Sequence, residues 1–226
     1  MSLNQILAIA ESVGINDQRF IGQVLSRNQR INTSEQLTVV PFAFTMKPMN
    51  YLRYSESRSL LSSLRVPDKA LEQYLNFSTT GWSNYIEYQG NMTSGQIDAC
   101  AWQTTSANNN LVLGSLPSIS SSAYIVKIGD FCQVGRYAYI ATANVQRGGV
   151  STVNIPVHRS LLTPLVSPVS AVIGEFGTTV SLGGSPYIGT TFCVILRSYP
   201  TYTLIPIQND SFIQWSGDFV AFESVV

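Results

Sequence analysis

Short runs of strand-forming residues follow one another along most of this chain, and this succession is what most limits its fold. The runs are separated by stretches rich in Gly, Ser, Asn and Pro, such as Ser106–Asn110 and Gly183–Pro186. Regular short strands with such separators are typical of a β-sandwich or barrel. From residue 71 on, the predicted strands are Leu71–Phe77, Trp82–Tyr88, Ile97–Trp102, Tyr124–Ile128, Tyr137–Val145, Val150–Val157, Thr179–Leu182, Phe192–Leu196, Tyr202–Ile207, Phe212–Trp215 and Phe219–Phe222.

Two segments have the periodicity of a helix instead. Near the N-terminus, Ser2 and Gln5 fit a capping box, and one helical face would hold Leu3, Ile6, Leu7 and Ala10. The segment Tyr54–Leu64 repeats at three- and four-residue spacings, through Ser57, Leu60, Leu61 and Leu64, and Pro67 ends it. The predicted fold is thus mainly β, a β-sandwich or barrel with one short internal helix and room for a small inserted β module.

The segment between these helices is predicted to form a β-hairpin. Residues 37–47 alternate, which would place four apolar side chains on one strand face: Val40, Phe42, Phe44 and Met46. The small polar residues Asn32–Ser34 supply a turn, and the return strand runs into Pro48. We therefore expect a hairpin within residues 19–47.

A chain of 226 residues fits one larger β domain or two small ones. The Ser-rich stretch Leu116–Ala123 is the best internal boundary, and a weaker one lies at Leu161–Ser170, where two prolines disfavour a central strand. The expected division is an N-terminal β region at residues 1–122, a possible small β module at 123–162 and C-terminal strands completing the main domain at 163–226.

The chain has few charges. Only 12% of its residues are charged, and thirteen Lys and Arg balance thirteen Asp and Glu. Interface cores are depleted in charge, so the composition favours a protein that packs against other proteins. It argues against electrostatic capture of nucleic acid, which needs clustered cations. The densest basic group is interleaved with two acids, which favours a solvated surface that neutralises itself: Arg53, Arg58 and Arg65 with Glu56 and Asp68.

The sequence predicts no catalytic, cofactor-binding or metal-ligating residue. The one histidine, His158, stands before Arg159 and Ser160, and this composition is more typical of a strand end or packed loop than of a catalytic triad. One histidine with three dispersed cysteines does not form a metal-ligand set. The cysteines lie in apolar runs, so we expect buried free thiols at Cys100, Cys132 and Cys193.

Other chemistry-bearing residues have plain structural interpretations. Carboxylates next to glycine, at Gly129-Asp130, Gly174-Glu175 and Gly217-Asp218, fit turns. The pair Gly183-Gly184 fits a hairpin and lacks the lysine of a phosphate loop. The tryptophans could form a sugar-binding platform but are more often core or interface anchors: Trp82, Trp102 and Trp215. No apolar run spans a membrane, and residues 1–14 lack signal-peptide features, so we expect synthesis in a cytoplasm.

Two stretches resemble a known class of proteins. The run Ile128–Tyr139 is followed by Val145, Gly148-Gly149 and Val153–Arg159. Near the C-terminus, Leu196–Tyr202 leads to Ile213–Phe219 and then Phe222-Glu223. This pattern of Gly-Asp turn, short strand, Tyr-bearing strand and closing Gly-x-Phe strand resembles tail and baseplate proteins of tailed bacteriophages, of the hub, tube-end adaptor or distal tail type. The resemblance implies small β units within ring-forming, architectural proteins that have no catalytic residues.

We therefore expect a virion structural protein, made in the host cytoplasm, that acts by ring assembly without chemistry. Its expected partners are copies of itself and other tail or baseplate proteins, with no membrane and no sequence-specific nucleic-acid binding. The hairpin at residues 19–47 and the helix at Tyr54–Leu64 are the candidate contacts between subunits. The alternative is a carbohydrate- or receptor-binding β protein, and a hydrolase with dispersed carboxylates is a third option.

Overall fold

The structure is a computed structural model that describes residues 3–17, 21–25, 31–35, 41–65, 71–105 and 108–225. For residues 21–25, 31–35 and 63–65 it describes the backbone alone. The chain is mainly β, with 46% strand and 13% helix, which confirms the predicted fold class. Several sheets stack into a sandwich-like arrangement, and the described strands close no barrel.

A five-stranded antiparallel sheet forms the centre of the molecule. Its strands come from both ends of the chain, in the order β1 (Ala10–Asn16), β4 (Ala43–Pro48), β22 (Phe219–Glu223), β19 (Thr191–Ser198) and β6 (Glu72–Asn76). The helix α1 (Leu3–Ala8) contacts β4 and β6 and buries Leu3, Ile6 and Leu7, as its sequence periodicity predicts. The central sheet is therefore complete only when the C-terminal strands have paired with the N-terminal ones.

Phenylalanine rings fill the first hydrophobic core, beside this sheet. Phe42, Phe44 and Met46 are fully buried, which confirms the predicted alternation, while Val40 lies outside the described residues. The ring of Phe192 on β19 is central, because it packs edge-on against four others: Phe42, Phe44, Phe77 and Phe131. Edge-to-face pairs of this kind add to the free energy of burial.

A second lobe holds a separate core. Its first sheet has the order β11 (Tyr137–Ile140), β10 (Phe131–Val134), β15 (Val172–Ile173) and β16 (Phe176–Gly177). Its second has the order β13 (Val153–Pro156), β8 (Asn110–Gly114), β7 (Ala101–Trp102) and β14 (Val169–Ser170). A short ladder joins β9 (Tyr124–Val126) to β12 (Val145–Gln146), and α3 (Ser94–Asp98) contacts β15 and β16.

The domain division at residues 123 and 163 stays a prediction. Strand pairs cross both positions, since β8 pairs with β13 and β10 pairs with β15. The second core likewise draws on side chains from Tyr88 to Ile173.

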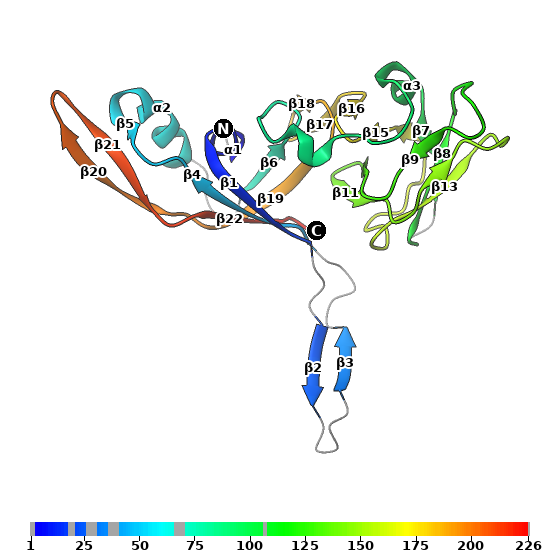
Figure 1. The fold of residues 1–226 in the computed structure, drawn as a ribbon, viewed down its shortest axis with the longest axis horizontal. Coiled ribbons are helices and arrows are strands. Elements are labelled where there is room, and N and C mark those ends of the chain that lie inside the picture. The colour runs from blue at the N-terminus through cyan, green and yellow to red at the C-terminus, as the bar shows by residue number, and fades with distance from the viewer. Residues whose placement is uncertain are drawn as a thin grey trace.

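The central sheet extends into an arm on the side away from the second lobe (Figure 1). Strands β19 and β22 continue as β20 (Thr201–Ile207) and β21 (Asp210–Ser216), which pair with each other along their whole length. The short strand β5 (Leu52–Arg53) pairs with β21, and α2 (Tyr54–Arg65) contacts both, which confirms the predicted internal helix. The arm is thus a three-stranded sheet, β20-β21-β5, with a helix against it.

Two small hairpins complete the fold. Strands β17 (Val180–Leu182) and β18 (Ser185–Tyr187) are joined by Gly183 and Gly184, both at positive φ, as predicted. Strands β2 (Ile21–Leu25) and β3 (Ile31–Glu35) pair only with each other and lie apart from the other sheets in Figure 1.

Part of the predicted hairpin at residues 19–47 is wrong. The expected turn at Asn32–Ser34 lies inside β3, and β4 pairs with β1. Strand β1 is not predicted because polar residues and a glycine interrupt its apolar alternation, at Glu11, Ser12 and Gly14. Val13 and Ile15 of the same strand nevertheless pack on the core. Ala10, expected on the first helix, begins β1 instead.

Two predicted strands are largely helical. Within Trp82–Tyr88 the chain forms a 3₁₀ helix, η1 (Ser83–Ile86), because Tyr85 packs against Phe77 and Phe131 from a single turn. Within Ile97–Trp102 the first residues belong to α3, which begins with a capping box of Thr93 and Gln96, and only the last two form β7.

Replacing the central ring of the first core, Phe192, tests how much this ring contributes to the free energy of unfolding. We expect Phe192→Ala to lower the free energy of unfolding by about 3–5 kcal/mol, since it removes a fully buried ring and leaves a cavity. Urea denaturation measures the change. The matched control is Leu71→Ala, at a 57% exposed side chain, which should change it by less than about 0.5 kcal/mol.

Candidate functional site: a buried junction and an exposed arm

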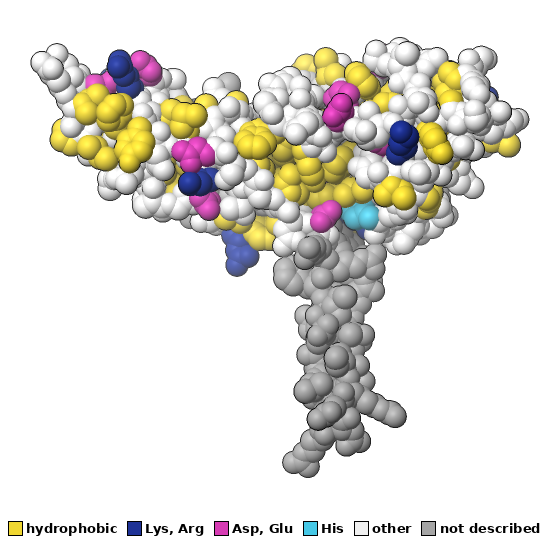
Figure 2. Space-filling model, viewed as in Figure 1, with side chains coloured by type: hydrophobic (Ala, Val, Ile, Leu, Met, Phe, Trp, Pro, Cys, Tyr) yellow, Lys and Arg dark blue, Asp and Glu magenta, His cyan; other side chains and the backbone are white. Residues whose placement is uncertain are grey.

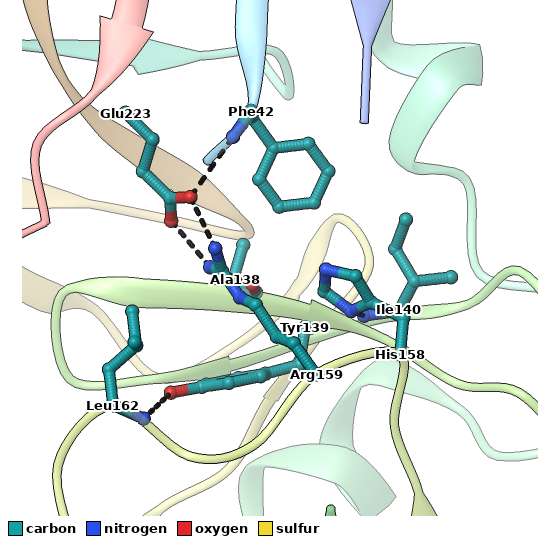
Figure 3. A network of polar contacts seen from close by, with 8 residues as sticks. All are labelled: Phe42, Ala138, Tyr139, Ile140, His158, Arg159, Leu162 and Glu223. Atoms are coloured by element: carbon teal, nitrogen blue, oxygen red, sulfur yellow. Dashed lines mark hydrogen bonds and ion pairs between the residues drawn. The ribbon is translucent and has the colours of Figure 1, made fainter. Parts of the chain in front are cut away.

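A buried ion pair joins the second lobe to the central sheet (Figure 3). Arg159, just after β13, contacts both carboxylate oxygens of Glu223, at the end of β22, with N–O distances of 2.6 Å. Each side chain is only 1% exposed. The same guanidinium donates to the carbonyl oxygen of Ala138 at 2.8 Å, and the backbone N–H of Phe42 donates to Glu223 Oε2 at 3.2 Å. Buried charges are tolerated when they are paired and hydrogen-bonded in this way.

Two aromatic rings enclose this pair. The guanidinium carbon of Arg159 lies 5.3 Å from the ring centre of Phe42 and 5.2 Å from that of Tyr139. Cations are attracted to ring faces at such distances. The Tyr139 hydroxyl accepts a hydrogen bond from the backbone N–H of Leu162 at 3.0 Å, which ties the loop after β13 to β11. The junction is therefore a packed structural unit.

His158 takes part in the same junction. Its Nδ1 accepts a hydrogen bond from the backbone N–H of Ile140 at 3.0 Å, and its ring centre lies 5.5 Å from that of Phe42. The neighbouring hydroxyl of Ser160 bonds to the side chain of Asn109 instead of to the imidazole. The geometry matches the predicted strand end. That the chain is no enzyme stays a prediction.

The cysteines lie where the sequence places them. All three are buried and free: Cys100, Cys132 and Cys193. Burial raises the pKa of Cys100 and of Cys193 to about 11, and it raises the pKa of Cys132 further. Thiols with raised pKa values are poor nucleophiles near neutral pH.

The carboxylates beside glycine belong to turns, as predicted. Gly129, Gly174 and Gly217 all have positive φ, which allows the chain to reverse there. Asp130 is buried and accepts backbone N–H groups from Gln89 and Lys127, both at 2.8 Å. Burial raises its pKa in spite of these bonds. Within the described residues, no group of three or more His, Cys, Asp or Glu side chains could hold a metal ion.

The tryptophans are anchors of the two cores. Trp102 is fully buried and donates to the carbonyl of Gln133 at 2.8 Å. Trp215 is 7% exposed and packs against Tyr202 and Phe219. Trp82 is partly buried, and its Nε1 donates to the carbonyl of Leu7 at 3.0 Å. These positions favour the anchor interpretation over a shared sugar-binding platform.

The arm has one buried and one open face. On the first, Ile213 and Trp215 of β21 join the first core together with Leu61 of α2. On the second, Phe212 and Gln214 of β21 stand opposite Ile205 and Thr203 of β20. The open face is partly or fully exposed at each of these four residues, and Figure 2 shows hydrophobic side chains gathered at this end of the molecule.

Tyr51 extends the open face. It is 62% exposed, and its ring stands edge-on to that of Phe212 at a centroid distance of 6.2 Å. Its φ of 64° is unusual for a bulky residue, and a hydrogen bond from its N–H to the carbonyl of Ile213, at 2.9 Å, holds that conformation. An aromatic residue held outward by the backbone is suited to contact a partner.

The sequence predicts two contacts between subunits, the hairpin at residues 19–47 and the helix α2. The hairpin at residues 19–47 falls mainly on side chains outside the described ones, so its role stays a prediction. The predicted self-neutralising group is present in part, since Arg53 of β5 lies 3.9 Å from Glu56 of α2, and the role of α2 as a subunit contact stays a prediction. The sequence identified β20 and β21 as strands but gave no sign that they form an arm, because nothing local distinguishes an exposed strand from a core strand.

Two comparisons with known proteins found no match. No family model matches the chain, and no curated protein matches it. None of the described helices is long and apolar enough to cross a membrane.

The ion pair should dominate the stability of the junction. We expect Arg159→Met to lower the free energy of unfolding by about 3–5 kcal/mol, because it leaves the Glu223 carboxylate buried without its partner. Removing both charges in Arg159→Met/Glu223→Leu should recover most of that loss. Urea denaturation of the four proteins of the double-mutant cycle measures the coupling. The exposed residue Arg53, changed to Met, is the control and should have a much smaller effect.

The arm should have an acid-sensitive contact with α2. Asp210 accepts the Ser55 hydroxyl at 2.7 Å and the Ser55 backbone N–H at 3.2 Å, and these bonds, with one from Ser211, lower its pKa below the ordinary value of 3.8. A lowered pKa adds stability above the unfolded value, and this is lost as the pH falls through the folded value.

We therefore expect Asp210→Asn to be less stable than the unchanged protein at pH 7, with a gap that shrinks as the pH falls below 3.8. Urea denaturation across this pH range gives the gap. A gap independent of pH would show that the Asp210 charge contributes nothing.

Proposed function

We propose that this chain is a virion structural protein of a bacteriophage tail or baseplate, which acts by assembling with copies of itself into a ring and contacting neighbouring tail proteins. The observation that supports assembly most directly is the arm. It offers an open strand edge at β20, which contains no charged residue, and an exposed aromatic residue, Tyr51, on a firmly packed body. Surfaces of this kind are aggregation hazards unless another chain covers them.

The chemistry-bearing residues support a non-enzymatic role. His158, Arg159 and Asp130 are engaged in backbone hydrogen bonds or an ion pair within the fold. Each of these contacts has a sufficient structural explanation in the packing of the two cores. Function would then reside in surfaces and not in a reaction.

The two stretches that resemble tail proteins carry the assignment to a virion. The first, Ile128–Tyr139, forms the β10–β11 hairpin, and the later stretches run through β19 and β20 and through β21 and β22. The C-terminal stretches that resemble tail proteins therefore cover the strands that continue from the central sheet into the arm. In a ring, a heterologous contact closes by rotation, so each subunit must present its contact surfaces at a fixed angle. The buried junction of Arg159 and Glu223 would supply that rigidity.

The mass of the purified protein tests the ring. We expect light scattering to give a multiple of the monomer mass and negative-stain images to show closed rings, because the open strand edge of the arm should not stay uncovered. Arg159→Met should weaken ring formation at temperatures where the variant is still folded. The control for folding is far-UV circular dichroism of each variant. A monomer at every concentration, without rings, would contradict self-assembly.

The alternative function is binding of a carbohydrate or a receptor. It would use exposed aromatic residues such as Tyr51, since rings stack on sugars. A monomer that binds a glycan array, with binding lost in Tyr51→Ala and kept in Leu71→Ala, would support this alternative over assembly.

A further inference from the structure

The open edge of the arm has a definite hydrogen-bonding pattern. In β21, the carbonyl of Ile213 accepts from Tyr51 at 2.9 Å, and the N–H of Trp215 donates to Asn50 Oδ1 at 3.0 Å. These two residues therefore direct their backbone groups toward β5. Backbone groups alternate along a strand, so Phe212, Gln214 and Ser216 must face β20.

The pattern of β20 follows from its register with β21. The residues that face Phe212, Gln214 and Ser216 are Ile205, Thr203 and Thr201. The even-numbered residues of β20 consequently direct their backbone groups to its outer side, where the described chain has no strand. At the centre of this edge lies Leu204, 46% exposed, and Pro206 offers a carbonyl but no N–H. The edge calls for an extended strand as its occupant.

We propose that this occupant is β20 of a second copy, paired antiparallel across a two-fold axis at Leu204. This inference rests on the proposed assembly function and names one of its contacts, an isologous one that joins two copies and acts beside the heterologous contact that closes a ring. A two-fold axis perpendicular to the sheet opposes residues whose numbers have a constant even sum, and centring it on Leu204 pairs all seven residues of the strand. Each Leu204 N–H then donates to the Leu204 carbonyl of the other copy.

The side chains of β20 suit such a pairing. Self-pairing brings identical residues close together, so charges would repel. Strand β20, Thr201–Ile207, contains none, whereas the outer strands of the central sheet contain Glu11 in β1 and Glu72 in β6. Thr203 would stand opposite Ile205 of the other copy, a pair of β-branched residues of the kind that sheets favour.

Access and position agree with this contact. Strand β20 is the outer strand of the arm, at the end of the molecule farthest from the second lobe (Figure 1). Two copies can therefore meet edge to edge while their bodies stay apart. The pairing uses the outer side of β20 in both copies, so no free edge of β20 remains for further strand addition. The contact would then end at a pair of copies.

Cysteine cross-linking of the full-length protein tests the register. We expect Leu204→Cys to form a disulfide-linked dimer under mild oxidation, because directly opposed Cα atoms lie about 5.5 Å apart. The matched variants Thr203→Cys and Ile205→Cys should cross-link at least tenfold more slowly, since their cysteines would be diagonal neighbours. The native cysteines are buried and give the background. Equal rates at all three positions would overturn the proposed pairing.

The mass in solution provides a second test. In light scattering, Leu204→Lys should halve the mass of the species that contains the contact, because two lysines would face each other. Gln214→Lys, on the exposed face of β21 but away from the edge, should leave the mass unchanged. Rings of unchanged mass in Leu204→Lys would overturn this contact and keep the proposed function. Dimers that Leu204→Lys disrupts, without rings, would support the contact and contradict the ring. A monomer at every concentration would overturn both.

Discussion

The ion pair between Arg159 and Glu223 fixes how the two halves of the molecule sit against each other. Both side chains are almost completely buried, so taking their charges out of water is costly. The bidentate geometry, the two backbone bonds from Phe42 and to Ala138, and the two flanking rings offset that cost. A lobe that rotated away from the sheet would break the two bonds between Arg159 and Glu223, so this one relative orientation is strongly preferred.

The same interaction reaches the arm through the covalent chain. Glu223 ends β22, and β22 is preceded by β21 of the arm with only Gly217 and Asp218 between them. Phe219, at the start of β22, packs against Trp215 of β21 and Tyr199, so the bend between central sheet and arm is filled with aromatic rings. Lobe, sheet and arm are therefore held as one body, and a contact made by the arm sets the position of the whole subunit.

The sequence predicts strands and helices whose signal is local. A local pattern predicts β4, through the alternation of Phe42, Phe44 and Met46, and another predicts α2, through its helical periodicity. The capping box that begins α3 is also local, at Thr93 and Gln96, and could have been found. The junction could not, because Arg159 and Glu223 lie 64 residues apart and neither has a distinctive neighbourhood. The arm could not either, since a strand's exposure depends on which other strands fail to cover it.

The folded protein buries several of its few charged residues. Of its few charged residues, Arg159, Glu223 and Asp130 are buried, and Arg136 pairs with a half-buried Glu72. The surface thus has even fewer charges than the composition suggests. A partner strand that pairs with β20 gives up little charge hydration, and the free energy of contact comes from apolar area and backbone hydrogen bonds. Such an association is only weakly sensitive to salt, because screening acts on charges that β20 does not have.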